Sequence, residues 1–232
     1  MGRNVCIAGA SRGLGFFLAK RYLELGDTVF AGVRDAAHPN MAALAAEFGD
    51  KVIPVEMDVV STASVTAAAD AVAAYTKTID ILICNAAIHS PTSFLDIAET
   101  DLDECLEVYD VNAVGPLRVA KAFLPMLPEG AQIVNVSSES GSVGICGRDK
   151  EFDYCMSKAA LNMGSKLLQN LLLPRGVKVL IIHPGWMRTD MGGPNAHRDP
   201  WETAVGLVDF FAQNTDPAKA MFLDFEGVEL PW

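Results

Sequence analysis

Short apolar runs alternate along this chain with stretches in which apolar residues recur every three or four positions. The apolar runs predict six strands, at 4–10, 28–33, 51–59, 79–87, 132–138 and 177–185. The periodic stretches predict a first helix that ends near Leu25, helices at 41–49, 61–75 and 154–172, and a long helical region at 101–127 that contains Pro116. Strands and helices therefore alternate from the N-terminus to about residue 185.

The predicted strands are apolar throughout, whereas a strand with one face in water alternates apolar and polar residues. Continuous apolar strands indicate a sheet that is covered by helices on both faces. Strand–helix alternation of this kind favours an α/β fold with a doubly wound parallel sheet. We expect about seven strands in a single domain that covers residues 1–232.

Composition and charge exclude several classes of function. The chain has 232 residues with Lys+Arg 18 against Asp+Glu 29, a net charge of −11, which argues against a nucleic-acid or anionic-membrane partner. No apolar run approaches the roughly 18 residues needed to cross a bilayer. The five cysteines have no C-x-x-C spacing and the four histidines no ligand spacing, so no metal site is predicted. We expect a cytoplasmic protein.

A glycine-rich turn joins the first strand to the first helix. Glycine is required where backbone approaches a pyrophosphate that rests on the N-terminus of a helix. The alternative is an ordinary glycine-rich turn, but the position after the first strand favours a dinucleotide. The predicted cofactor contacts in this turn are Gly9, Ser11, Arg12, Gly13, Leu14 and Gly15.

The end of the second strand distinguishes between the two nicotinamide cofactors. An acidic residue about 20 positions past the glycines would bind the ribose 2′-hydroxyl of NAD. Here the strand is followed by Arg34, and Arg12 lies in the glycine turn. Two guanidinium groups suit a 2′-phosphate, so NADP(H) is favoured over NAD(H). Asp35 is a mild counter-signal, and a solvated surface arginine is the alternative interpretation of Arg34.

The remaining strand ends supply further cofactor contacts, because ligands of such sheets bind beyond the carboxyl ends of the strands. A carboxylate after the third strand could accept a bond from the adenine amino group, and small residues after the fourth let the cofactor lie against the backbone. The segment 185–199, after the sixth strand, is expected to be a mobile apolar lid that includes Trp186 and Met191; the alternative is that these side chains pack on the core. The predicted contacts are Asp58, Val59, Asn85, Ala86, Ala87, Pro184, Gly185 and Met187.

Tyr154 and Lys158 are spaced to lie one above the other on a helix. The pair is either a reactive centre or a surface tyrosine beside a solvated lysine. Ser138 ends the fifth strand, where Ser137, Ser140 and Ser142 crowd the same position. Glu139 is interpreted as a solvent-facing carboxylate rather than a substrate contact. Asn112 lies inside the long helical region, an unusual place for a short polar side chain unless it bends the helix or holds water.

The motifs GASRGLG, CNAA, VNAVGP, VNVSS, YCMSK and HPGWMRTDM follow one another in an order that resembles the single-domain short-chain dehydrogenase/reductase family over essentially the whole chain. The 16-residue interval from Ser138 to Tyr154 and the ending FLDFEGVELPW resemble its branch of sniffer-type carbonyl reductases and C-factor-like proteins. The resemblance implies a Rossmann-type fold and a catalytic set of Asn112, Ser138, Tyr154 and Lys158. It also implies that Tyr154 and Lys158 contact the cofactor and that Thr189 binds the nicotinamide carboxamide.

Three residues depart from the family pattern. Ala8 stands where Thr is usual, Cys84 where Asn is common, and Ala87 where Gly is usual. All three lie in the expected cofactor wall, so they put local hydrogen bonding and cofactor affinity in question.

These residues predict an NADPH-dependent reductase of a ketone or aldehyde, or an alcohol dehydrogenase in the reverse direction. Tyr154 would exchange the proton, with its pKa lowered by the Lys158 ammonium. Ser138 would bind the carbonyl oxygen and Asn112 would fix a water. The alternatives are an NADP(H)-binding regulatory or signalling protein with little turnover and, more weakly, a sugar epimerase. Apolar residues on 101–127 and 154–172 favour a homodimer or homotetramer.

Overall fold

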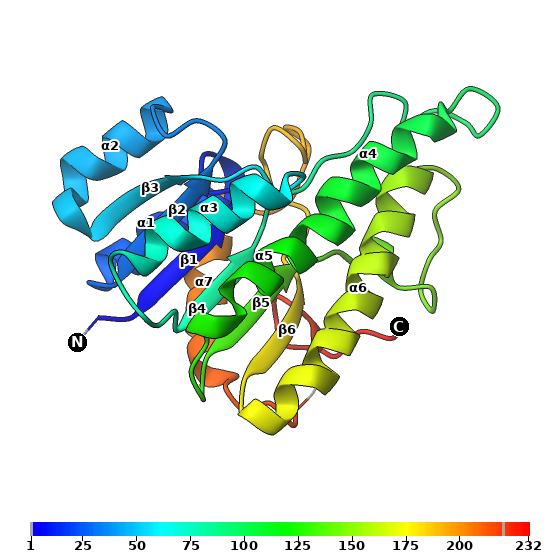
Figure 1. Cartoon of the computed structure of the whole chain (residues 1–232). Coiled ribbons are helices and arrows are strands. Elements are labelled where there is room, and N and C mark those ends of the chain that lie inside the picture. The colour runs from blue at the N-terminus through cyan, green and yellow to red at the C-terminus, as the bar shows by residue number, and fades with distance from the viewer. Residues whose placement is uncertain (1, 220) are drawn as a thin grey trace.

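Seven parallel strands form one sheet in the computed structural model, which describes residues 2–219 and 221–232 (Figure 1). The strand order is β3-β2-β1-β4-β5-β6-β7. The strands are β1 (Asn4–Ala8), β2 (Thr28–Val33), β3 (Val52–Glu56), β4 (Ile81–Cys84), β5 (Gln132–Val136), β6 (Lys178–His183) and β7 (Phe222–Asp224). The doubly wound parallel sheet predicted from the apolar runs is confirmed.

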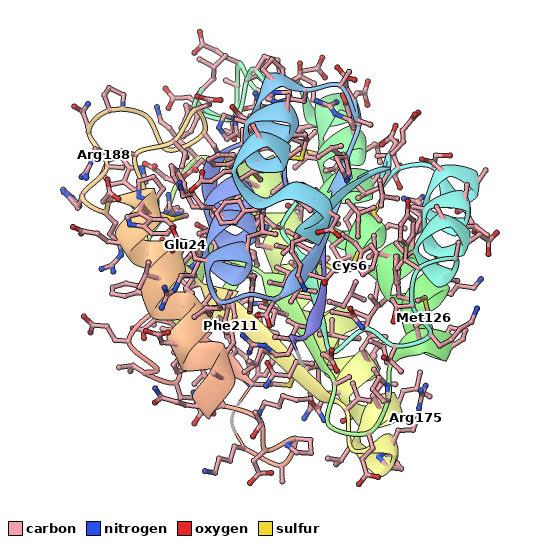
Figure 2. The ribbon with its side chains drawn as sticks, turned by 90° about the vertical axis from the view of Figure 1, so that its left-hand side faces the viewer. Cys6, Glu24, Met126, Arg175, Arg188 and Phe211 are labelled. Carbon is pink, nitrogen blue, oxygen red and sulfur yellow. The ribbon has the colours of Figure 1, made fainter. Side chains whose placement is uncertain are left out.

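Helices cover both faces of the sheet. The helices are α1 (Gly13–Glu24), α2 (Pro39–Phe48), α3 (Thr62–Ala73), α4 (Cys105–Tyr109), α5 (Gly115–Phe123), α6 (Phe152–Leu172) and α7 (Pro200–Gln213). Alternate residues of β1 serve the two faces: Cys6 packs with the layer of α3 and α5, and Ile7 with the layer of α1, α2 and α7. In Figure 2, Phe211 of α7 lies against the sheet and Cys6 lies within it. Both faces are buried, which explains the lack of alternation in the strand sequences.

The predicted long helical region at 101–127 is confirmed, but it is not one uniform α-helix. A 3₁₀ turn (Leu102–Glu104) leads into α4, a π-helical turn (Asp110–Val114) follows, and α5 then begins at Gly115. Pro116 has no N–H to donate to the carbonyl four residues earlier, and a wider turn removes that demand. The Gly115 N–H bonds instead to the Asp110 carbonyl.

Two elements follow residue 185 that the pattern analysis did not assign. Asp199 caps α7 by accepting bonds from the backbone N–H groups of Trp201 and Glu202, and Pro200 occupies the first helical position. Strand β7 has only three residues, too few to give a periodic signal. Among the helices of the described residues, none combines the length and apolarity that a membrane span requires.

Candidate active site

The predicted site residues come from several strand ends, and the parallel sheet brings these ends to one edge. In the sheet order, β1 lies beside β4, and this is where the chain reverses its direction of winding. The crevice at such a reversal is where ligands of open parallel sheets bind.

The glycine turn after β1 has the shape that a bound pyrophosphate requires. Gly9 and Gly13 have positive φ angles of 87° and 55°. A Cβ on Gly15 would lie 2.1 Å from the Gly9 carbonyl oxygen, and one on Gly9 would lie 2.8 Å from the Ala86 backbone. Bulkier residues would be strained or would clash at these places. The N-terminus of α1 follows directly, so the turn fits the phosphates of a dinucleotide.

The segment after β4 is fastened to this turn. Asn85 Nδ2 donates a hydrogen bond of 2.8 Å to the Gly9 carbonyl oxygen. Ala87 is tolerated in place of glycine because Glu151 is the only non-glycine residue in the described chain with a positive φ. Cys84 is buried, with its Sγ 3.8 Å from the Pro116 carbonyl oxygen, and burial raises the pKa of its thiol to about 12. Cys84 thus packs as a small apolar residue that donates one weak bond to α5.

The two arginines predicted to bind a 2′-phosphate lie in the glycine turn and after the end of β2. Arg34 is exposed immediately after β2. Asp35, the counter-signal, accepts a 2.9 Å bond from the Ala37 backbone N–H, so part of its carboxylate caps its own turn. Arg12 is exposed and lies 3.4 Å from Asp190 of the 185–199 segment. These donors suit a phosphate on the adenosine ribose.

Tyr154 and Lys158 lie on the first two turns of α6, with Lys158 Nζ 5.4 Å from the centre of the tyrosine ring. Lys158 is 2% exposed, and its Nζ donates a 2.8 Å bond to the carbonyl oxygen of Val136 at the end of β5. Burial lowers the pKa of Lys158 to about 7. Burial also raises the pKa of the Tyr154 phenol, and hydrogen bonding to Ser138 opposes that rise only in part. The expected lowering of the phenol pKa is therefore wrong in this structure, because lost solvation raises that pKa by more than the hydrogen bond lowers it.

The serines near the end of β5 differ in their hydrogen-bond partners. Ser137 Oγ donates a 2.6 Å bond to Asn162 in α6, and Ser142 Oγ donates a 2.5 Å bond to the Pro231 carbonyl oxygen. Ser138 Oγ donates instead to Ser140 Oγ, at 3.0 Å. Hydrogen bonding between Ser138 and the Tyr154 phenol lowers the pKa of that phenol in part. Ser138 is therefore the serine whose hydroxyl lies with the tyrosine.

Glu139 is not simply solvated. Arg148 Nη2 donates a 2.6 Å bond to the Glu139 carboxylate, and Arg148 Nη1 bonds to the Glu151 carboxylate. The arginine thus ties both ends of the segment between Ser138 and Tyr154 together, beside the N-terminus of α6.

Asn112 lies fully buried in the π-helical turn and holds the structure around the tyrosine. Its Oδ1 accepts a 2.8 Å bond from the Ile88 N–H, and its Nδ2 donates to the Ile88 carbonyl oxygen at 2.7 Å and to Ser157 Oγ at 3.0 Å. Ser157 Oγ in turn donates to the Tyr154 carbonyl oxygen at 2.8 Å. Both amide hydrogens are used, so the side chain can hold the expected water only through a lone pair of Oδ1.

The segment 185–199, the expected lid, is held together by hydrogen bonds between its own residues. The backbone N–H of Arg198 bonds to the Trp186 carbonyl oxygen at 3.1 Å, and that of Arg188 bonds to the Arg198 carbonyl oxygen at 3.0 Å. Trp186 Nε1 donates a 2.8 Å bond to the Gly192 carbonyl oxygen. Thr189 lies against the glycine turn, with its Cγ2 3.7 Å from a Cβ placed on Gly13. Arg188 lies on this loop beyond the N-terminal end of α7 (Figure 2).

The remaining predicted contacts lie at the same edge. Asp58 Oδ1 accepts a 3.2 Å bond from the Val60 N–H, and Val59 packs against Gly115 of α5. Pro184 is buried, and Gly185 has a φ of 82° at a place where a Cβ would clash with Arg198. Met187 is partly buried against the apolar layer of α1, α2 and α7.

Sequence reasoning missed Asp153, Ser157 and Asn162, three buried polar residues of α6. Each bonds to a residue outside α6: Asn162 Nδ2, for example, donates a 3.1 Å bond to the Gly141 carbonyl oxygen. One sequence signal could have identified them: they are polar residues at helix positions that are expected to be buried, and buried polar groups need hydrogen-bond partners.

Comparison with known proteins accounts for this geometry. Residues 3–200 match the family model of the short chain dehydrogenases. The chain belongs to the short-chain dehydrogenase family. The match spans the glycine turn, the π-helical turn, Tyr154 and Lys158, so it includes most of the candidate site.

Three relatives illustrate how far the similarity of this short-chain dehydrogenase extends. C-signal of Myxococcus xanthus is 34% identical over 159 residues, which cover 68% of this chain and 95% of that protein. The structure of NADPH-bound carbonyl reductase from chicken fatty liver is 31% identical with a TM-score of 0.89, covering 100% of this chain and 99% of that one. The carbonyl reductase Sniffer of D. melanogaster is 27% identical with a TM-score of 0.92, covering 100% of both chains. The expected branch of sniffer-type reductases and C-factor-like proteins is confirmed.

Proposed function

We propose that this short-chain dehydrogenase is an NADP(H)-dependent carbonyl reductase that reduces a ketone or aldehyde. The observation that carries the proposal is the convergence of Ser138, Tyr154 and Lys158 at the sheet edge that also holds the glycine turn. The similarity to an NADPH-bound carbonyl reductase supports both the cofactor and the reaction.

The cofactor choice rests on residues of this chain. Arg34 and Arg12 would hold the 2′-phosphate, and Asp35 would not repel it strongly because its carboxylate caps a turn. The turn Gly9–Gly15 would hold the pyrophosphate, while Asn85–Ala87 and Thr189 would line the crevice that binds the cofactor. When bound, the nicotinamide supplies the hydride. The reacting carbonyl then needs a hydrogen-bond donor and a proton.

Tyr154 would donate that proton. A phenol with an ordinary pKa near 10 is already protonated at neutral pH, and burial raises the pKa of Tyr154 further. A protonated donor suits the reduction of a carbonyl rather than the oxidation of an alcohol. Ser138 would donate a hydrogen bond to the carbonyl oxygen and fix its place. Lys158, with a pKa of about 7, can both release and accept a proton near neutrality, so it suits the resupply of the phenol.

A panel of aldehydes and ketones tests the proposal through NADPH consumption, with wild type and Tyr154→Phe measured side by side. We expect turnover of at least one apolar carbonyl compound by the wild type and almost none by the variant. The similarity to C-signal supports the second candidate, a cofactor-binding signalling protein. That candidate would bind NADPH tightly and consume it with no compound of the panel.

We also propose that the protein is a homodimer joined through α4 and α6, which lie side by side in Figure 1. Both helices expose large apolar side chains on one face, and Leu106 is 74% exposed. The exposed apolar residues of the two helices are Leu106, Tyr109, Met156, Met163, Leu167 and Leu171. A face of this kind can pair with its own copy about a two-fold axis. Sedimentation of wild type and Leu167→Glu tests it: a dimer that becomes a monomer is expected, and a monomeric wild type contradicts it.

A further inference from the structure

A buried carboxylate stands next to the candidate proton donor. Asp153 is 1% exposed, in the first turn of α6. Its Oδ2 accepts a 2.7 Å bond from the Ser90 N–H, and its Oδ1 accepts a 2.6 Å bond from Ser93 Oγ. Burial opposes the charge of this carboxylate, but these bonds outweigh it and lower the pKa of Asp153. A charge is kept inside a protein only where such bonds compensate it.

The partners of Asp153 belong to the loop 88–93, which continues the segment Asn85–Ala87. At its first residue, this loop is held by the two bonds between Ile88 and Asn112. At its last residue, Ser93 is bonded twice to the start of α6: its Oγ donates to Asp153, and its carbonyl oxygen accepts a 2.8 Å bond from the Glu151 N–H. The loop is therefore fixed at one end by the π-helical turn and at the other by the helix that carries Tyr154.

Two other contacts fix the start of α6: Arg148 bonds to the Glu151 carboxylate, and Ser157 links the Tyr154 carbonyl oxygen to Asn112. Glu151 precedes the helix with φ 61° and ψ 39°, in the left-handed region, and its side chain makes no cap hydrogen bond. A non-glycine residue in such a conformation costs on the order of 1–3 kcal/mol and persists where its surroundings enforce it. The two bonds from Ser93 are part of those surroundings. A carboxylate in the first turn also interacts favourably with the helix dipole.

We propose that Asp153 is a positioning residue for Tyr154. Its carboxylate fastens loop 88–93 to the first turn of α6 and so sets the place of the phenol relative to the segment Asn85–Ala87. Successive helical residues point about 100° apart, which lets Asp153 face the loop while Tyr154 faces the site. The inference rests on the proposed function only for the role of Tyr154 as proton donor.

The test compares Asp153→Ala, Asp153→Asn and Ser93→Ala with the wild type. We expect Asp153→Ala to lower kcat about 10- to 100-fold, a fraction of the 10²–10⁴-fold contribution of a positioned proton donor. The Kd for NADPH should stay within about twofold, since the Arg34 and glycine-turn contacts are untouched. Asp153→Asn keeps one acceptor and should rescue part of the loss, and Ser93→Ala should show a smaller loss. If Asp153→Ala fails to fold, the other two variants carry the same test.

If Asp153 acts by positioning Tyr154, the loss of kcat in Asp153→Ala must depend on the presence of the Tyr154 hydroxyl. In a Tyr154→Phe background, measured at high enzyme concentration, Asp153→Ala should cause no further loss of kcat; a further loss of the same factor would overturn the proposal. Asp27→Asn is the matched control, because Asp27 is also buried and also accepts several bonds, from Arg3 far from the site. This control should lower the melting temperature without changing kcat per folded molecule.

A readout without turnover separates this proposal from the proposed function. Ultraviolet titration, with Tyr154→Phe as the reference, gives the pKa of the phenol in each variant. We expect that pKa to move toward its ordinary value in Asp153→Ala, because a displaced phenol is better solvated. An unchanged phenol pKa overturns the positioning role. Absence of turnover in the wild type would instead refute the reductase proposal and leave the titration able to decide the role of Asp153.

Discussion

The buried Lys158 should make the stability of the cofactor-free protein depend on pH in a specific window. Burial lowers the pKa of its amine from 10.5 to about 7, so between these values the unfolded chain binds a proton that the folded chain does not. Stability therefore rises with pH in this range, with a slope of about 1.4 kcal/mol per pH unit. From about pH 7 to about pH 9 the gain is about 2 kcal/mol.

Urea unfolding of the wild type and Lys158→Met at several pH values measures this gain. Methionine keeps the apolar stem and removes the charge, so the variant should lack the rise. Lys166→Met, at an exposed position of the same helix, is the control and should follow the wild type. Parallel pH profiles for the wild type and Lys158→Met would refute the reasoning, since they would mean that the buried amine keeps an ordinary pKa.

Three further outcomes are expected. Arg34→Ala should weaken NADPH binding by on the order of 1.5–3 kcal/mol, the contribution of a charge-assisted bond, and leave NADH binding unchanged; equal wild-type affinities for the two cofactors would contradict the assignment. Tyr154→Phe should lower turnover by about 10²–10⁴-fold with NADPH affinity intact, and a variant that keeps more than about a tenth of wild-type activity would remove the tyrosine from the chemistry. In the segment 185–199, hydrogen exchange of the Arg188 and Arg198 amides should already be slow without cofactor, because both donate to carbonyls within the segment; fast exchange there would support a mobile lid.

The sheet and its site edge were accessible from sequence because parallel strands buried on both faces leave continuous apolar runs. The residues at the end of each run then lie at the common carboxyl edge, and this rule led to Arg34, Asn85 and Ser138. The π-helical turn was not accessible, because the sequence signals of Asn112 and Pro116 fit a bent α-helix equally well.

The pKa values of Tyr154 and Lys158 and the role of Asp153 depend on burial, which the residue types alone do not reveal. The charge effect of Lys158 on Tyr154 was argued from their spacing, yet the structure buries Lys158 and partly buries Tyr154, and desolvation then dominates each pKa. Asp153 was overlooked for a related reason. On a helix start an acidic residue is usually solvated, and only the fold brings loop 88–93 over it.

The strand order has a consequence for the synthesis of the chain. Strand β1 lies in the middle of the sheet between β2 and β4, but β4 begins only at Ile81. At translation rates of about 5–20 residues per second, the backbone edge of β1 on that side stays unpaired for roughly 4–15 seconds. During this interval an apolar strand such as Val5–Ala8 can pair with another nascent chain. Ribosomes crowded on one message, or a stall before Ile81, should therefore lower the yield of folded protein more than a stall near the C-terminus.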